Sequence, residues 1–228
     1  MTTKIPAWSY SALTLFDQCP LKYKKLRVTK EIKEPESEAM IYGTEVHKAA
    51  ELHVRDSVPI SPKYKFIQPY MDKMKALPGN KLCEHKLGLR IEDGKIVPCG
   101  FFANDVWFRC VVDLLSLDNA KGVAYVIDYK TGKSSQYADD LQLKLMAAAV
   151  FLHFGQIQTI RAGLLFFIAK DFIKRIYDTK QKLTVFSEVD TILQRREVAY
   201  ETGVFNPKQN FTCKGWCPVM SCKHNGRR

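Results

Sequence analysis

The sequence predicts an α/β fold in which a helix, three strands, a helix and a further strand follow one another, with helical segments at both ends. Two observations carry this prediction. Segments rich in β-branched and aromatic residues occupy the middle of the chain and are separated by turn residues. Segments with helical spacing of apolar residues lie before and after them. The 228 residues, 46% hydrophobic and 26% charged, can form one large core and exclude a disordered or low-complexity chain.

The first part of the chain is predicted to be helical. Residues 9–27 form a helical arm, because a serine can cap a first short helix and Pro20 suits the first turn of a second one. Residues 38–54 show helical spacing of apolar side chains and carry His47. A further helix is expected over residues 62–77, where the following Pro-Gly-Asn sequence ends it.

The middle of the chain is predicted to form a sheet. Apolar side chains alternate with polar or small ones over residues 87–91, Asp93-Gly94 supplies a hairpin turn, and residues 95–102 return antiparallel. Residues 106–117 and 123–130 are rich in strand-forming residues and flank a turn-like segment. We expect these two segments to pair antiparallel.

The last part alternates between helix and strand. Residues 139–154 contain no Gly or Pro and predict a helix, residues 162–169 a buried strand and residues 172–178 a further strand. Residues 186–200 predict a closing helix, with Gly203 at its C-terminal cap.

No internal repeat and no linker divides the sequence, so we expect a single domain over residues 1–228. It would consist of a helical arm (1–37), a core (38–178), and a C-terminal helix with a Cys-rich tail (179–228). The apolar runs are shorter than the roughly 20 residues that cross a bilayer, so no membrane association is expected. The N-terminus lacks the apolar segment of a signal peptide, which favours a cytoplasmic, intracellular location.

The charge of the chain favours a polyanionic partner. Lys and Arg number 35 against 24 Asp and Glu, which gives a net charge of +11. Basic residues are concentrated at both ends, and beyond Glu201 there are five basic residues and no acidic one. A basic but merely solvated surface would have the same composition, so charge alone does not identify a nucleic-acid partner.

The sequence VIDYKTG, residues 126–132, is the most informative segment. Asp128 and Lys130 are two residues apart on a strand and therefore point to the same face, at the end of an apolar run. Because burying unpaired charges is costly, the two must face each other, water or a ligand. Asp113 ends the apolar stretch of the preceding strand and can reach the same end of the sheet in a hairpin.

Two carboxylates and a lysine are the groups that phosphodiester hydrolysis requires. Carboxylates are hard oxygen ligands for Mg²⁺, and the bound ion neutralises phosphate charge and makes water a better nucleophile. The lysine adds a positively charged donor toward the negative charge that develops on the phosphate. A salt bridge at a strand end would show the same Asp-x-Lys spacing, so the spacing alone leaves both interpretations open.

Four motifs, in this order, resemble those of the PD-(D/E)XK nucleases, specifically the RecB-like branch with its AddB-type and phage-encoded exonucleases. They are Gly43-Thr44-x-x-His47, Asp113 at its strand end, Asp128-Tyr129-Lys130-Thr131-Gly132, and Gln142 on the following helix. The resemblance covers nearly the whole chain. It implies a central mixed sheet flanked by helices in the order α-β-β-β-α-β, and a nuclease that depends on Mg²⁺ or Mn²⁺.

The resemblance also implies roles for individual residues. Asp113 and Asp128 would bind the metal together with the backbone carbonyl of Tyr129. Lys130 would orient or activate the water and stabilise the transition state. His47 resembles the family's additional metal ligand, and an imidazole suits Mn²⁺ better than Mg²⁺.

Two further residues are assigned less directly. Gln142 resembles the Gln of the family's Gln-x-x-x-Tyr motif, which lies along the DNA strand, but this chain has Met146 where the Tyr is usual. Glu84, just before the first expected strand, is either a further acid of the site or an ordinary surface residue.

Four of the seven cysteines form a second group of interest. Cys213, Cys217 and Cys222 lie in a short tail, and Cys19 is the obvious remote fourth ligand; clustered cysteines in an intracellular protein favour metal. One cysteine before the core and three after it resemble the iron–sulfur staple of AddB-type nucleases, in which a [4Fe-4S] cluster ties the two ends together. A zinc site that uses His224 and a tail without metal remain alternatives. The other cysteines are expected to be small core residues.

The expected function is that of a metal-dependent DNA exonuclease acting on ends or single strands in recombination, repair or phage DNA processing, with a possible helicase or recombination partner. Aromatic residues that could stack on bases are Tyr10, Phe16, Tyr23 and Trp216, although burial in the core is the default expectation for each of them. The alternatives are an endonuclease of the same fold and a catalytically inactive DNA-binding module.

Overall fold

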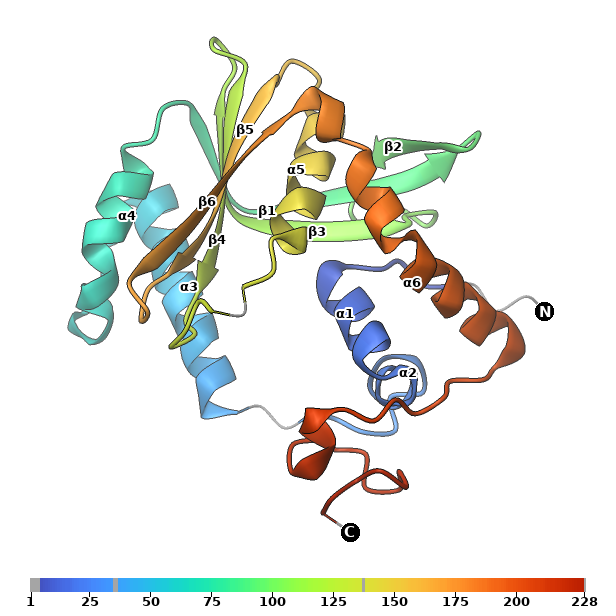
Figure 1. Ribbon diagram of the computed structural model, residues 1–228. Coiled ribbons are helices and arrows are strands. Elements are labelled where there is room, and N and C mark those ends of the chain that lie inside the picture. The colour runs from blue at the N-terminus through green and yellow to red at the C-terminus, as the bar shows by residue number, and fades with distance from the viewer. Residues whose placement is uncertain (1–4, 35–36, 137, 228) are drawn as a thin grey trace. The chain divides into compact units, whose positions relative to one another are not determined.

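The structure is a computed structural model that describes residues 5–34, 37–136 and 138–227 (Figure 1). The chain divides into two compact units, one of Met1–Glu36 with Phe186–Arg228 and one of Ser37–Val185. The larger unit contains the whole sheet. The single domain expected from the sequence stays a prediction.

The larger unit is built on one six-stranded sheet in the order β2-β1-β3-β4-β5-β6. Neighbouring strands are antiparallel except β4 and β5, which are parallel and joined by helix α5 (Leu141–His153). This mixed sheet confirms the predicted α/β fold. The strands are β1 (Asn80–Glu92), β2 (Lys95–Cys99), β3 (Phe108–Asp118), β4 (Val123–Lys130), β5 (Thr159–Phe166) and β6 (Asp171–Asp178).

The predicted hairpin turn is present, but the first strand is longer than expected. Asp93 and Gly94 both have positive φ, 51° and 71°, as a tight two-residue hairpin requires. Strand β1 begins at Asn80, seven residues before the alternation that predicted it. Strand β2 ends at Cys99 and tolerates Pro98 because it lies at the edge of the sheet.

The helix predicted over residues 62–77 is two elements. A 3₁₀ helix, η2 (Pro62–Ile67), precedes the shorter helix α4 (Gln68–Lys75). The reason is Pro69, which lacks an N–H and is tolerated only in the first turn of a helix. The expectation of one continuous helix was therefore wrong. Helix α3 (Glu38–Asp56) agrees with its prediction and is capped by the Ser37 side chain.

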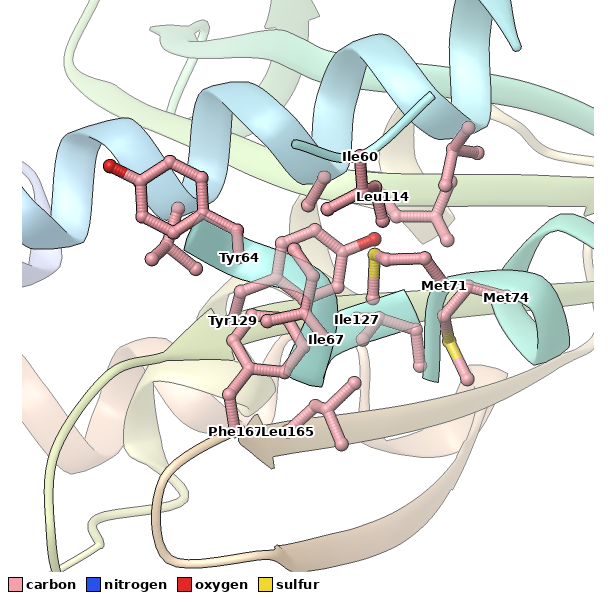
Figure 2. Packing of buried hydrophobic residues seen from close by; sticks show 13 residues of the cluster. Ile60, Tyr64, Ile67, Met71, Met74, Leu114, Ile127, Tyr129, Leu165 and Phe167 are labelled. Atoms are coloured by element: carbon pink, nitrogen blue, oxygen red, sulfur yellow. The ribbon is translucent and has the colours of Figure 1, made fainter. Parts of the chain in front are cut away.

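Helices cover both faces of the sheet (Figure 1). Helices α3 and α4 pack on one face, where Figure 2 shows side chains of α4 and η2 in contact with those of β3, β4 and β5. The strand residues of this cluster are Leu114, Ile127, Tyr129 and Leu165. Helix α5 is buried over most of its surface and contacts the sheet strands. The core therefore fixes the ends of β3 and β4 between two helical layers.

The smaller unit consists of helices from both ends of the chain. They are α1 (Tyr10–Gln18), α2 (Pro20–Tyr23), the π-helix η1 (Lys24–Val28), α6 (Thr184–Thr202) from Phe186 onward, and the 3₁₀ helix η4 (Phe211–Lys214). The rings of Phe16 and Tyr23 pack against Phe205 with centroids 6.4 and 6.5 Å away. The predicted helical arm and closing helix are confirmed, and the short 3₁₀ helix η3 (Thr179–Gln181) precedes α6 in the larger unit.

Candidate active site

The site begins where strands β3 and β4 separate. Their antiparallel pairing runs from Asp118 opposite Val123 to Leu114 opposite Ile127 and stops there. Asp113 is the next residue of β3, and its Oδ2 accepts a 2.6 Å hydrogen bond from the backbone N–H of Tyr129. The carboxylate thus accepts the backbone N–H of β4 in place of a backbone carbonyl of β3. A buried acid is held between the two strands by backbone geometry.

Helix α3 brings His47 to this carboxylate. The Nδ1 of His47 lies 3.4 Å from Oδ2 of Asp113, and its ring meets the Tyr129 ring edge-on with centroids 5.8 Å apart. Gly43 lies one turn earlier, where a Cβ would stand 3.2 Å from Oγ1 of Thr131. The glycine of the Gly-x-x-x-His motif therefore lets α3 approach the end of β4 closely.

Glu84 is the third member of the group. Ligand atoms of His47, Glu84 and Asp113 all lie within 4.8 Å of one another, and among the described residues this is the one such group that could hold a metal ion. Cys83 pairs with Leu114 and His85 with Val112, so Glu84 stands level with Asp113. Its φ of 50° is unusual for a non-glycine residue.

The sequence left the role of Glu84 open because the predicted strand began only at residue 87. The strand in fact begins at Asn80 and carries Glu84 beside the carboxylate of Asp113. The available signal was the position of an acidic residue between Cys83 and His85 within a segment that can extend the strand.

Asp128, Lys130 and Gln142 form a closed triangle next to this group. Nε2 of Gln142 donates to Oδ1 of Asp128 at 2.7 Å, and Nζ of Lys130 donates to Oε1 of Gln142 at 2.8 Å. Nζ of Lys130 also lies 2.7 Å from Oδ2 of Asp128. That contact is a close ion pair without hydrogen-bond angles, so the buried Oδ2 lacks a hydrogen-bond donor. Gln142 on α5 thereby fixes both strand residues.

The pKa values at the site are shifted because several ionisable groups lie close together in a partly buried region. Burial, followed by the charge of Asp113, raises the pKa of Asp128 to about 6, although Lys130 opposes the shift. Burial and then Asp113 also raise the pKa of Glu84. Burial disfavours the charged form of His47, but the carboxylate of Asp113 outweighs it and raises the pKa of the imidazole. Without a cation the negative charges repel one another, and this repulsion favours the protonated forms of Glu84 and Asp128.

The residues present fit a divalent cation. The donors are an imidazole nitrogen and carboxylate oxygens, which Mg²⁺ and Mn²⁺ accept. The buried Oδ2 of Asp128 forms an ion pair with Lys130 but accepts no hydrogen bond, so a cation could be its second partner. His47 and Glu84 also line an open hollow of about 710 Å³. A phosphate group could therefore approach the acids from solvent.

The structure brings together most of the residues singled out from the sequence. His47 and Asp113 form one group with Glu84, whose role the sequence left undecided. Asp128 is not a member of this group and contacts Lys130 and Gln142 instead. The backbone N–H of Tyr129 binds Asp113, and a role for its carbonyl stays a prediction. Met146 is buried in α5, so this position offers no polar group to a strand.

The four cysteines of interest all lie buried as free thiols in the smaller unit. The Sγ of Cys19 accepts backbone N–H groups of Lys22 and Lys208, each at 3.5 Å. Cys217 and Cys222 pack in one small cluster. A tetrahedral zinc site would hold sulfurs about 3.8 Å apart, given Zn–S bonds of about 2.3 Å. No three cysteine sulfurs of the described chain meet within 4.8 Å, so this arrangement is not a preformed zinc site.

Two of the aromatic residues considered for base stacking are unavailable. Phe16 and Tyr23 are 1% and 2% exposed and belong to the core of the smaller unit, so the default expectation of burial holds for them. Trp216 is 79% exposed and can still contact a base.

Similarity to known proteins agrees with the fold and the motifs. The family model of the PD-(D/E)XK nuclease superfamily matches residues 7–84 and 72–222. No similarity to a curated protein was found. Within the described chain, no helix combines the length and the apolar character that a membrane span needs.

Solved structures share the fold at low sequence identity. The crystal structure of the protein SSO0001 aligns with a TM-score of 0.51 at 14% identity, over 99% of this chain and 90% of that one. A candidate exonuclease from Eubacterium rectale aligns with a TM-score of 0.54 at 13% identity, over 96% of this chain and 88% of that one. At such identities these two structures support the fold alone. Because the family model spans most of the sequence, the chain belongs to the PD-(D/E)XK nuclease superfamily.

Proposed function

We propose that this protein is a divalent-metal-dependent DNA exonuclease of the RecB-like branch, acting on DNA ends or single strands in recombination, repair or phage DNA processing. The observation that carries the proposal is the convergence of three potential metal ligands, His47, Glu84 and Asp113, beside the Asp128–Lys130–Gln142 triangle. The Eubacterium rectale protein that shares this fold is itself described as a candidate exonuclease, which is consistent with the proposal.

In this proposal His47, Glu84, Asp113 and Asp128 hold Mg²⁺ or Mn²⁺, with the Tyr129 carbonyl as a further ligand. The bound cation would neutralise phosphate charge and lower the pKa of a water molecule. The backbone N–H of Tyr129 keeps the Asp113 carboxylate oriented toward His47. The site is therefore preorganised by backbone and helix contacts before any substrate arrives.

Lys130 is proposed to orient or activate the attacking water and to stabilise the transition state. Its side chain is 32% exposed, so its ammonium group can reach a water molecule or a phosphate oxygen while it contacts Asp128 and Gln142. Gln142 holds the lysine and the aspartate in register through one donated and one accepted hydrogen bond. In this arrangement Gln142 is a positioning residue, whose loss would misalign Lys130.

The proposal is tested by cleavage of linear single- and double-stranded DNA labelled at the 5′ or 3′ end, with Mg²⁺ and with Mn²⁺. We expect metal-dependent release of short products from one end, and its loss in Lys130→Met and Asp113→Asn while DNA binding is retained. Lys121→Met, which removes an exposed lysine near Asp118, is the matched control and should cleave normally. A folded wild type that binds DNA but cleaves nothing would show an inactive binding module.

Covalently closed circular DNA separates the two modes of cleavage. An exonuclease leaves closed circles intact, whereas nicking or linearisation of the circle would show an endonuclease of the same fold.

We also propose that Cys19, Cys213, Cys217 and Cys222 bind a [4Fe-4S] cluster that ties together the two chain ends of the smaller unit. The four buried free thiols and the N–H donors to Cys19 support this proposal. A cluster is larger than a single ion and accommodates more widely spaced sulfurs than zinc does.

Anaerobic purification tests the cluster. Absorbance near 400 nm with iron and sulfide bound to the protein is expected, and should be lost in Cys19→Ser but retained in Cys110→Ser, a cysteine of β3. Bound zinc without colour, or no bound metal at all, would contradict the cluster proposal. The nuclease proposal would stand or fall separately, on the cleavage assay. A helicase or recombination partner remains part of the proposal and is testable by copurification.

A further inference from the structure

Strands β1 and β3 extend beyond β4 as a ribbon, and the edge strand β2 pairs with β1 at the outer end of this ribbon. The pairing of β1 with β3 runs from Leu89 opposite Phe108, whereas β3 pairs with β4 only from Leu114 onward. The turn that joins β2 to β3, residues 100–107, follows the end of this ribbon (Figure 1). The ribbon belongs to the same compact unit as the candidate active site.

Two aromatic and two basic side chains gather on this ribbon and turn. Lys86 Nζ lies 5.8 Å from the Phe101 ring centroid and 5.3 Å from that of Phe102, and the Arg109 guanidinium lies 5.4 Å from the Phe101 centroid. The two rings meet edge-on with centroids 5.0 Å apart. These four residues, Lys86, Phe101, Phe102 and Arg109, are called the aromatic–basic track below.

The aromatic–basic track shares a face with the catalytic carboxylate. Asp113, Val111 and Arg109 alternate along β3, and Lys86 stands opposite Val111 in the β1–β3 register. Arg109 lies four positions before Asp113 along β3, which is about 13 Å at about 3.3 Å per residue. That span corresponds to roughly four nucleotides of a stacked strand at about 3.4 Å each.

The charge and exposure of the track fit a nucleic acid. Lys86 and Arg109 have no acidic partner among the described residues, whereas the neighbouring Arg90 is paired with Glu92 and Asp105. Phe102 is 74% exposed, so a face of its ring is available to a base. Exposed aromatic rings interleaved with cations are the pattern that binds the bases and phosphates of a single strand.

We propose that the aromatic–basic track binds the single-stranded part of the substrate a few nucleotides from the scissile phosphate, with Phe102 stacking on a base and Lys86 and Arg109 contacting phosphates. This inference rests on the proposed function and specifies the strand that enters the same site. Base pairs inside a duplex are covered on both faces by stacking and offer none to Phe102, so the track favours single strands over paired DNA.

Fluorescence anisotropy tests the track with labelled thymidine oligonucleotides of three and twelve nucleotides, with Ca²⁺ in place of Mg²⁺. We expect Phe102→Ala to weaken binding of the twelve-nucleotide strand by about 5- to 100-fold, the usual cost of one lost base–aromatic stack. Lys86→Gln should reduce the slope of log affinity against log salt by about 0.7, as one lost phosphate contact does on a single strand. The three-nucleotide strand should be affected little by either variant.

The matched controls lie at the opposite edge of the sheet, Ile176 on β6 and Lys180 in the short 3₁₀ helix η3 that follows it. Ile176→Ala removes another exposed apolar side chain and Lys180→Gln another exposed lysine, and both should bind the long strand as the wild type does. Unchanged binding in Phe102→Ala and Lys86→Gln would overturn the inference. The same result accompanied by altered sedimentation of Phe102→Ala would assign the ring to a protein contact and overturn it equally.

A minimal substrate separates this inference from the proposed catalysis. Thymidine 5′-p-nitrophenyl phosphate with Mn²⁺ occupies the reacting centre without reaching the track, so Phe102→Ala should hydrolyse it at the wild-type rate. If the wild type cleaves neither this ester nor DNA but its binding depends on Phe102, the catalytic proposal fails and the track is supported. If cleavage is normal and Phe102→Ala binds normally, only the track fails.

Discussion

Replacing Asp128 by asparagine should abolish cleavage and at the same time stabilise the metal-free protein at neutral and alkaline pH. Asp128 is 4% exposed, and burial together with the charge of Asp113 raises its pKa to about 6 despite the contact with Lys130. Above that pH the metal-free protein must keep a buried carboxylate close to a second one. Asparagine has nearly the same shape and carries no charge, so this cost disappears.

The sign and size follow from the pKa. Because the folded pKa lies above the ordinary value of 3.8, the folded protein binds the proton more tightly than the unfolded chain does. The stabilisation is complete below about pH 4 and is lost as pH rises through about 6. The difference between the two pKa values corresponds to roughly 3 kcal/mol at most. The stability advantage of Asp128→Asn should therefore grow from near zero at pH 4 to as much as about 3 kcal/mol at pH 8.

Urea unfolding followed by circular dichroism in EDTA at pH 5 and pH 8 measures this difference directly. Contributions from the rest of the chain cancel between the two proteins. Asp118→Asn is the matched control, since Asp118 is also buried in β3 but accepts a backbone N–H and contacts Lys121. An advantage that does not depend on pH, or an asparagine variant less stable than the wild type at pH 8, would refute the reasoning. Mn²⁺ should stabilise the wild type and have a smaller effect on Asp128→Asn.

Three other variants test the site and the sheet. Gln142→Leu removes both hydrogen bonds to Asp128 and Lys130 and should lower kcat by about 10- to 100-fold with KM little changed, as steady-state cleavage would show. His47→Gln should raise the Mn²⁺ concentration for half-maximal activity more than that of Mg²⁺, because an imidazole favours Mn²⁺; equal shifts would argue against direct ligation. Gly163→Ala would place a Cβ 2.1 Å from Cε2 of Phe172 and should cost about 1–3 kcal/mol of unfolding free energy. Adding Phe172→Ala should relieve this overlap, and additive losses would contradict the steric explanation.

The sequence by itself determined the class of fold and most of the chemistry. The order of helices and strands, the hairpin at Asp93-Gly94 and the strand-end positions of Asp113 and Asp128 depend on local periodicity and turn residues, which sequence patterns report. The one helix that was wrong, over residues 62–77, failed at Pro69, a local rule that the apolar spacing concealed.

Only the tertiary structure decided which acidic residues lie next to one another at the candidate site. Glu84 could be assigned once β1 began at Asn80 and its register set it beside Asp113, and register depends on pairing between segments about thirty residues apart. The same holds for the aromatic–basic track, in which Lys86 of β1 and Arg109 of β3 both contact the Phe101 ring. The burial of Phe16 and Tyr23 likewise depends on contacts with Phe205 at the other end of the chain. The sequence gives the chemistry of each side chain directly. Which distant segments lie close together depends on packing, and that cannot be read from a single sequence.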